Sequence, residues 1–254
     1  MSPGSLTRRR LAVQRRRAFL RRRAIRRREA PLLLALALAA GSLDALSYLG
    51  LHRVFPANMT GNTVLLAVAV ARGSGADATR SAAALGGFAL GVLSGTLLMP
   101  RRPGRWPGSA ALTLLAEAIA LLALAVWWAS VGASPVRYWL ILLAGAAMGS
   151  QSTAVHASHV NGVTTTYMTG TFMHAIVRAV NRLRRAPNAP QAPHVPNLPG
   201  AAWIVYLIGA LIGAVAERAW HAYAVLIPLG LVLPVVLLAV TRREEPRHGS
   251  ERSG

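Results

Sequence analysis

Two carboxyl side chains lie inside long apolar stretches of the sequence, where charged residues are rare. Asp44 lies near the end of the stretch 31–51, and Glu117 lies well inside the stretch 109–130. A charge is costly in hydrocarbon, so such side chains usually face a cavity or a partner and often relay protons. Both residues are therefore candidates for proton coupling. The alternative is a neutral carboxyl group that is hydrogen-bonded within the protein.

A short polar motif occurs twice, once in each half of the chain. Each copy is followed by an apolar run of only about a dozen residues, which as a helix reaches roughly 20 Å against a hydrocarbon core of roughly 30 Å. Short segments with glycine and hydroxyl groups, at corresponding positions of two halves, indicate a central binding site. The copies are Asn58-Met59-Thr60-Gly61-Asn62-Thr63 and Thr165-Thr166-Tyr167-Met168-Thr169-Gly170-Thr171.

The motif residues could hold a small solute. Free N–H groups at a helix start and the positive end of the helix dipole favour an anion, and the side chains add neutral donors and acceptors. The alternative is that these residues only pack the helices and satisfy interrupted backbone. The candidate substrate-binding residues in the motif are Asn58, Thr60, Gly61, Asn62, Thr63, Thr165, Thr166, Thr169, Gly170 and Thr171.

The apolar composition places these candidates in a membrane. Of the 254 residues, 54% are apolar, and the mean hydropathy of +0.42 is too high for an ordinary soluble domain. Six segments have the length of a transmembrane helix, and none shows the polar face that a soluble helix needs. The sequence thus predicts an all-α polytopic membrane protein. The segments cover residues 31–51, 81–100, 109–130, 138–156, 200–216 and 220–240.

Two arrangements across the membrane agree with these segments. In the first, six long helices cross and the two short motif helices are re-entrant or half-spanning, which makes the halves inverted. In the second, the short helices also cross, which gives eight spans and parallel halves. The arginines 101, 102 and 105 in one short loop are a strong cytoplasmic mark and favour the first arrangement. Both arrangements place both termini in the cytoplasm.

Three landmarks recur in the same order and predict an internal duplication. Gly149-Ser150 follows Gly41-Ser42 by 108 residues, Met168-Thr169-Gly170 follows Met59-Thr60-Gly61 by 109, and Gly209 and Gly213 follow Gly91 and Gly95 by 118. The predicted organisation is an Arg-rich cytoplasmic tail (1–30), membrane repeat one (31–130), membrane repeat two (131–241) with a Pro-rich loop (186–199), and a second cytoplasmic tail (242–254).

Glycines four residues apart give one predicted helix a smooth face. Gly87, Gly91 and Gly95 allow the backbone of another helix to approach closely. The partner could belong to the same chain or to a second copy, so a homo-oligomer is possible.

The net charge of +20 is concentrated at the N-terminus, where residues 1–30 hold twelve arginines against Glu29. Such a tail is expected to lie next to anionic lipid at the bilayer surface, either disordered or as a basic amphipathic helix. Recognition of nucleic acid is not expected, because aromatic residues for base stacking are nearly absent from the tail.

The sequence gives little support to catalysis or metal binding. It contains no cysteine, and the only histidine group is His156, His159 and His174, with no acidic residue nearby. We therefore expect no enzyme activity, no metal and no other cofactor. An intramembrane enzyme built on these histidines is the third alternative.

The motifs resemble those of the YoaK family of bacterial integral membrane proteins (domain of unknown function 1275). The resemblance is carried by Asp44-Ala45-Leu46-Ser47-Tyr48, by Phe55-Pro56-Ala57-Asn58-Met59-Thr60-Gly61, and by Gly149-Ser150-Gln151 with the second motif copy. It implies a multi-helix fold in the bacterial plasma (inner) membrane and adds Gln151 to the candidate substrate-binding residues. It implies no substrate or reaction.

Together these patterns predict a small secondary transporter or permease for a polar or anionic solute, with Asp44 and Glu117 carrying a coupled proton. The alternative is a non-transporting scaffold, or a protein that binds lipid or a partner, in which the motif only packs helices.

Overall fold

The computed structural model describes residues 29–100, 106–131, 138–158, 168–184 and 198–243, which are mostly helical and contain no strand. One of the apolar helical segments has 45 residues, about twice the length that a bilayer needs, and a 3-10 turn divides it into two helices. The chain is therefore a helical membrane protein. Within the described ranges, four segments are long and apolar enough to cross a membrane, namely Glu29–Gly50, Gly75–Leu98, Gly108–Ser130 and Leu198–Arg242.

Each of the six apolar segments predicted from the sequence is helical, and each motif copy begins a short helix, of 13 residues for the first and 16 for the second. The N-terminal helix is Glu29–Gly50. The elements that follow are α2 (Met59–Ala71), α3 (Gly75–Leu98), η1 (Gly108–Ala110), α4 (Ala111–Val131), α5 (Tyr138–His156), α6 (Met168–Leu183), α7 (Leu198–Trp220), η2 (His221–Val225) and α8 (Leu226–Arg243).

Helix α5 is one of the six predicted spans, yet it is not among the four segments that are long and apolar enough. Its second half contains the run Ser150-Gln151-Ser152-Thr153, which lowers its hydropathy. Eleven of its 19 residues are buried. The polar side chains of α5 thus contact protein more than lipid. The mean hydropathy of such a helix is low because it includes these buried polar side chains.

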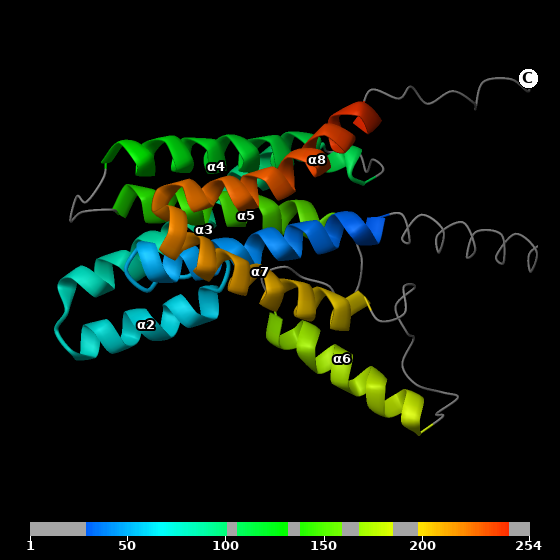
Figure 1. The fold of residues 1–254 in the computed structure, drawn as a ribbon, viewed down its shortest axis with the longest axis horizontal. Coiled ribbons are helices and arrows are strands. Elements are labelled where there is room, and N and C mark those ends of the chain that lie inside the picture. Colours follow the sequence, from blue (N-terminus) through cyan, green and yellow to red (C-terminus); the bar gives the residue numbers. More distant parts are fainter. Residues whose placement is uncertain (1–28, 101–105, 132–137, 159–167, 185–197, 244–254) are drawn as a thin grey trace, which may run out of the picture.

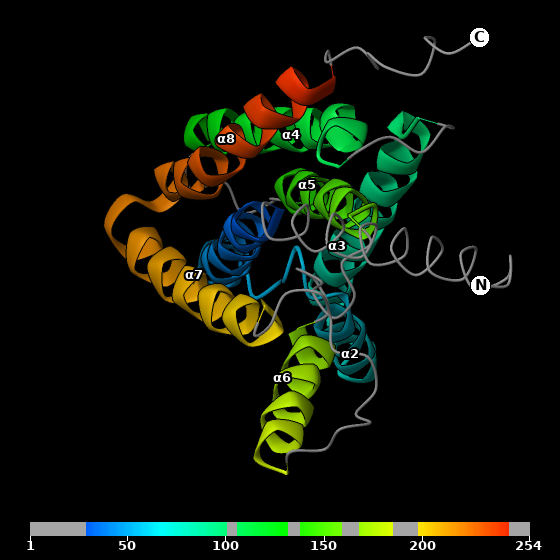
Figure 2. The same ribbon diagram turned by 90° about the vertical axis from the view of Figure 1, so that its right-hand side faces the viewer.

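In Figure 1 the long helices run in a common direction, and the two short helices, α2 and α6, lie at the lower side of the molecule. α2 packs beside α3 and α6 beside α7, and the two short helices run toward opposite ends of the molecule. The N-terminal ends of α2 and α6 lie toward each other in both views (Figures 1 and 2). The start of the N-terminal helix and the end of α8 lie at the same end of the molecule (Figure 1).

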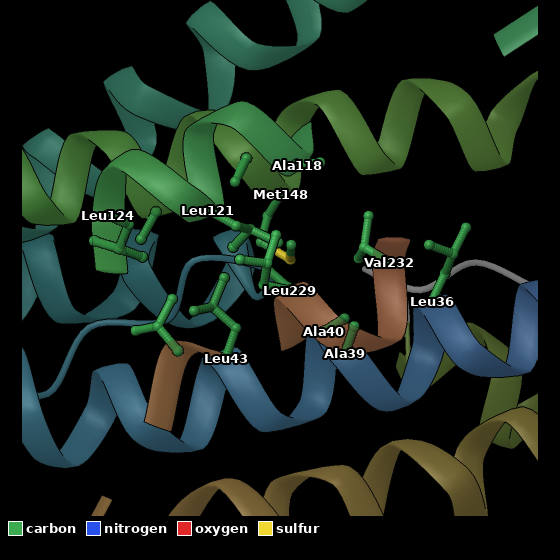
Figure 3. Packing of buried hydrophobic residues seen from close by; sticks show 14 of the residues in the cluster. Leu36, Ala39, Ala40, Leu43, Ala118, Leu121, Leu124, Met148, Leu229 and Val232 are labelled. Atoms are coloured by element: carbon green, nitrogen blue, oxygen red, sulfur yellow. The ribbon is translucent and has the colours of Figure 1, made fainter. Parts of the chain in front are cut away.

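Helix α8 fills the space between the N-terminal helix and α4 (Figure 3). Its Leu229 and Val232 point into a cluster that includes Leu36 and Leu43 of the N-terminal helix and Leu121 of α4. Lipid tails are as apolar as leucine, so this contact is stabilised by close van der Waals packing and not by removal of apolar surface from water.

Glycines bring α3 and α5 into backbone contact, as the smooth face of α3 predicts. A Cβ atom on Gly91 would overlap the carbonyl oxygen of Ala146, and one on Gly149 would overlap that of Phe88. The partner of this face therefore lies in the same chain. Only glycine permits such an approach, because a backbone carbonyl cannot rotate away as a side chain can.

The N-terminal helix crosses α7 in the same manner. A Cβ atom on Gly209 would overlap the carbonyl oxygen of Leu38, and one on Gly41 would overlap that of Tyr206. Each of these contacts has a counterpart between α3 and α5. The contact of Gly209 with Leu38 corresponds to that of Gly91 with Ala146, and the contact of Gly41 with Tyr206 corresponds to that of Gly149 with Phe88. Corresponding residues are 108 or 118 positions apart, which are the offsets of the sequence landmarks.

Candidate functional site

The chain leaves helical geometry between the N-terminal helix and α2, at residues 51–58. The helix ends with a bond from the Arg53 N–H to the Tyr48 carbonyl oxygen (2.9 Å). His52 and Arg53 then adopt left-handed backbone conformations, with φ of 63° and 64°. This conformation costs a residue other than glycine roughly 1–2 kcal/mol, so surrounding contacts must hold it in place.

Four of the eight residues of the non-helical segment are buried, so their main-chain polar groups need partners inside the protein. Asn62 of α2 supplies two of them. Its Oδ1 accepts a hydrogen bond from the Phe55 N–H (3.0 Å), and its Nδ2 donates to the Phe55 carbonyl oxygen (2.6 Å). Asn62 is fully buried. Its amide can both accept and donate, and it thereby takes the place of the backbone partner that an unwound segment lacks.

Asp44 attaches the same segment to two long helices. Its Oδ1 accepts a hydrogen bond from the Ala57 N–H (2.7 Å), and its Oδ2 accepts one from the Tyr206 hydroxyl (2.5 Å). The Asp44 side chain is 3% exposed. One carboxyl group therefore joins the N-terminal helix, the unwound segment and α7, through hydrogen bonds of the strong kind that a carboxylate accepts.

The other residues of the first motif copy have lesser contacts. Asn58 is the N-cap of α2, and its Oδ1 accepts a hydrogen bond from the Gly61 N–H (3.1 Å). The Thr63 hydroxyl donates to the Met59 carbonyl oxygen within α2 (2.9 Å). Thr60 and Thr63 are exposed on the surface of the short helix.

The second motif copy is described only from Met168 onward, so Thr165 and Thr166 lie outside the described residues. Thr169 is exposed in the first turn of α6, which begins at Met168. Thr171 is 1% exposed and occupies the position that corresponds to Asn62. The two buried polar residues of the motif copies are thus equivalent in the sequence.

Gly61 and Gly170 differ in their surroundings. A Cβ atom on Gly61 would lie 3.2 Å from Phe55 and 3.1 Å from the Asn58 amide, so glycine relieves crowding there. At Gly170, no described atom lies within 4 Å of such a Cβ. Close approach of protein atoms therefore explains Gly61, and among the described atoms it gives no reason for the glycine at position 170.

Two further candidates are fully buried in the bundle. Neither carboxyl oxygen of Glu117 has a hydrogen-bond partner within the described part of the chain. Gln151 donates from Nε2 to the Leu36 carbonyl oxygen (3.0 Å) and so connects α5 to the N-terminal helix, whereas its Oε1 lacks a described partner. No described hydrogen bond or ion pair joins Glu117 to Asp44, so the two carboxyl groups are separate features.

The histidines do not form a metal site in the described ranges. His156 and His174 are both exposed, on α5 and α6, and His159 lies outside the described residues. Within these ranges, no three histidine, aspartate or glutamate side chains come together.

Sequence reasoning missed Tyr206. It is the only tyrosine in the segment 200–216, and its hydroxyl needs a partner if it is buried in a membrane. A tyrosine inside an apolar segment therefore indicates a buried hydrogen bond. The sequence does not identify the partner as Asp44, because Asp44 lies 162 residues away.

Comparisons with known proteins agree with the sequence resemblance. The family model described as "Protein of unknown function (DUF1275)" matches residues 32–239. The chain is similar to the UPF0700 transmembrane protein YoaK of Bacillus subtilis (strain 168), with 32% identity over 209 residues that cover 82% of this chain and 92% of the relative. No solved structure matches the chain.

Proposed function

Given that this chain belongs to the DUF1275 family, whose function is unknown, we propose that it is a small secondary permease for a polar or anionic solute in the bacterial inner membrane. One observation carries the proposal. Half of the unwound segment 51–58 is buried within a helical membrane protein, and Asp44 and Asn62 hold it in place. Non-helical backbone at such a position is typical of transporters, where it lines a substrate site.

The same proposal includes six spans and two half-spanning helices, α2 and α6, in two inverted halves. Three features support it. The crossing of α3 with α5 matches that of the N-terminal helix with α7, the short helices run toward opposite ends, and the start of the N-terminal helix and the end of α8 lie at one end. At about 1.5 Å per residue, α2 and α6 are also shorter than the hydrocarbon core.

Single cysteines should distinguish six spans from eight, because the natural chain has none. We expect a cysteine at Ala76 to react with an impermeant thiol reagent from outside intact cells, and one at Pro103 to react only after the membrane is opened. Eight spans would reverse the two results. An unlabelled wild-type chain serves as the background control.

The substrate site in this proposal lies between the N-terminal ends of α2 and α6. Thr60 and Thr169 are exposed in the first turns of these helices and are the hydroxyl groups we assign to the solute. The two helix dipoles favour an anion there. Asn58 and Asn62 are assigned to holding the backbone instead, since their side chains are already hydrogen-bonded to it.

Proton coupling is assigned to Glu117 and Asp44. A buried carboxyl group without a partner is much less costly when neutral than when charged, so Glu117 can hold a proton and release it only when its surroundings change. Asp44 links the unwound segment to α7, so a proton on Asp44 would weaken that link.

Proteoliposomes with an internal pH dye should reveal this coupling. The panel of test solutes contains small organic anions and inorganic phosphate. We expect a proton flux that depends on the presence of one of these solutes. Glu117→Gln and Asp44→Asn should each lower the flux about tenfold or more, because both remove a titratable proton. Glu217→Gln, at the end of α7 next to an exposed histidine, is the matched control and should retain the flux.

Flux that both variants leave unchanged would exclude the proton role. If the wild-type protein transports none of the solutes in the panel, the result favours the alternative of a non-transporting scaffold or lipid-binding protein. That alternative predicts that removing residues 1–28 abolishes function, whereas Thr60→Val and Thr169→Val do not. We further propose that the protein is not an enzyme, needs no cofactor and has both termini in the cytoplasm.

A further inference from the structure

A pocket of about 350 Å³ lies where the unwound segment, α2 and the start of α3 meet. Its polar lining includes three arginines, Arg53, Arg72 and Arg80, and one carboxylate, Asp77. The charged side chains of the pocket therefore sum to an excess of positive charge. This pocket is separate from the buried contacts of Asp44 and Asn62 described above.

Each oxygen of the single carboxylate already has a partner. Asp77 Oδ1 forms an ion pair with Arg80 (2.6 Å), and Asp77 Oδ2 accepts a hydrogen bond from the Ser74 hydroxyl (2.7 Å). Arg53 and Arg72 have no hydrogen bond or ion pair from their guanidinium groups within the described part of the chain. Asp77 attracts Arg53 electrostatically, but it is one carboxylate against three arginines in the lining, so an excess of positive charge remains. A guanidinium group matches the geometry of a phosphate or carboxylate.

The lining also has an apolar part. Val54, Leu65 and Val68 form a wall beside the arginines. A volume of this size also exceeds what a bare inorganic ion requires and falls within the range of small-molecule sites. The ligand that fits best therefore carries an oxyanion on an organic body with some apolar surface.

We propose that this pocket binds a phosphate-type oxyanion carried on a small organic molecule or on a lipid headgroup, through Arg53 and Arg72. α3 begins at the rim of the pocket, where Ser74 is the N-cap but uses its hydroxyl on Asp77 and makes no capping bond. The positive end of the α3 dipole adds to the attraction for an anion.

The test is a binding measurement on the full chain in neutral detergent, so it does not depend on transport. Thermal unfolding is followed by tryptophan fluorescence during titration, at constant ionic strength, with inorganic phosphate, glycerol phosphate, short-chain phosphatidylglycerol or short-chain phosphatidylcholine. The twelve arginines of the N-terminal tail attract anions by their charge, and each variant keeps that background.

We expect saturable stabilisation by at least one of the three oxyanion ligands. Arg53→Gln and Arg72→Gln should each weaken the apparent affinity about tenfold, because each removes a charge-assisted contact. Arg218→Gln removes an exposed arginine at the end of α7 and should change the affinity by less than about twofold. Saturation by phosphate or glycerol phosphate identifies a soluble ligand, and saturation by phosphatidylglycerol alone identifies a lipid headgroup.

Arg53→Gly separates binding from folding. Glycine adopts the left-handed conformation of position 53 without strain, so this variant should be at least as stable as the wild type without ligand and should still bind about tenfold more weakly. The proposal is overturned if no oxyanion ligand saturates, if phosphatidylcholine stabilises equally well, or if Arg218→Gln weakens binding as much as Arg53→Gln.

Discussion

Gly91→Ala is expected to lower the stability of this protein by about 3 kcal/mol or more. The added methyl group would overlap the carbonyl oxygen of Ala146, so α3 and α5 would have to move apart. Since both partners are backbone, no side-chain rotation can relieve the contact. For a chain of this size, such a loss corresponds to a melting temperature about 6 °C lower or more, measured by thermal unfolding in detergent.

The matched control is Gly86→Ala on the same helix. No described atom lies within 4 Å of a Cβ atom at Gly86, so this substitution adds only the better helix propensity of alanine. We expect it to leave the melting temperature unchanged or to raise it slightly. Gly209→Ala, at the corresponding position of the other crossing, should be as damaging as Gly91→Ala. Equal melting temperatures for Gly86→Ala and Gly91→Ala would contradict the close crossing of α3 and α5.

Asp44→Ala is expected to release the unwound segment from the bundle. It removes the acceptors of the Ala57 N–H and the Tyr206 hydroxyl, and hydrogen bonds to a charged group contribute about 1.5–3 kcal/mol each. The free energy of unfolding should therefore fall by about 3 kcal/mol or more. Tyr206→Phe breaks only one of the two bonds and should cost about half as much.

A cysteine at Ala57, which is 1% exposed, reports the release directly. In the chain with Ala57→Cys alone, the thiol should react slowly with a soluble reagent, and Asp44→Ala should speed this reaction about tenfold or more. The matched control is Ser47→Ala, on the same helix. The Ser47 hydroxyl is buried without a described partner, so its removal should change neither the stability nor the reaction rate. Similar rates for Asp44→Ala and Ser47→Ala would rule out the anchoring role.

The sequence by itself determined the class of the protein and its elements. Apolar segments of membrane-spanning length predicted the long helices, and the short runs after each motif copy predicted α2 and α6. The glycines of α3 predicted a close helix contact, and Asp44 and Glu117 were recognised as carboxyl groups inside apolar segments. These features are local, because hydropathy and helical periodicity depend on residues near one another in the chain.

Only the tertiary structure decided what these residues contact. It showed that the glycine face of α3 packs against α5 and that Asp44 accepts a hydrogen bond from Tyr206. It also showed that Asn62, a candidate substrate-binding residue, is hydrogen-bonded to the backbone of Phe55. It also brought Arg53 and Arg72 into one pocket. The physical reason is that a buried polar group must find a partner wherever the fold supplies one. That partner can lie far away in the sequence, where no local pattern records it.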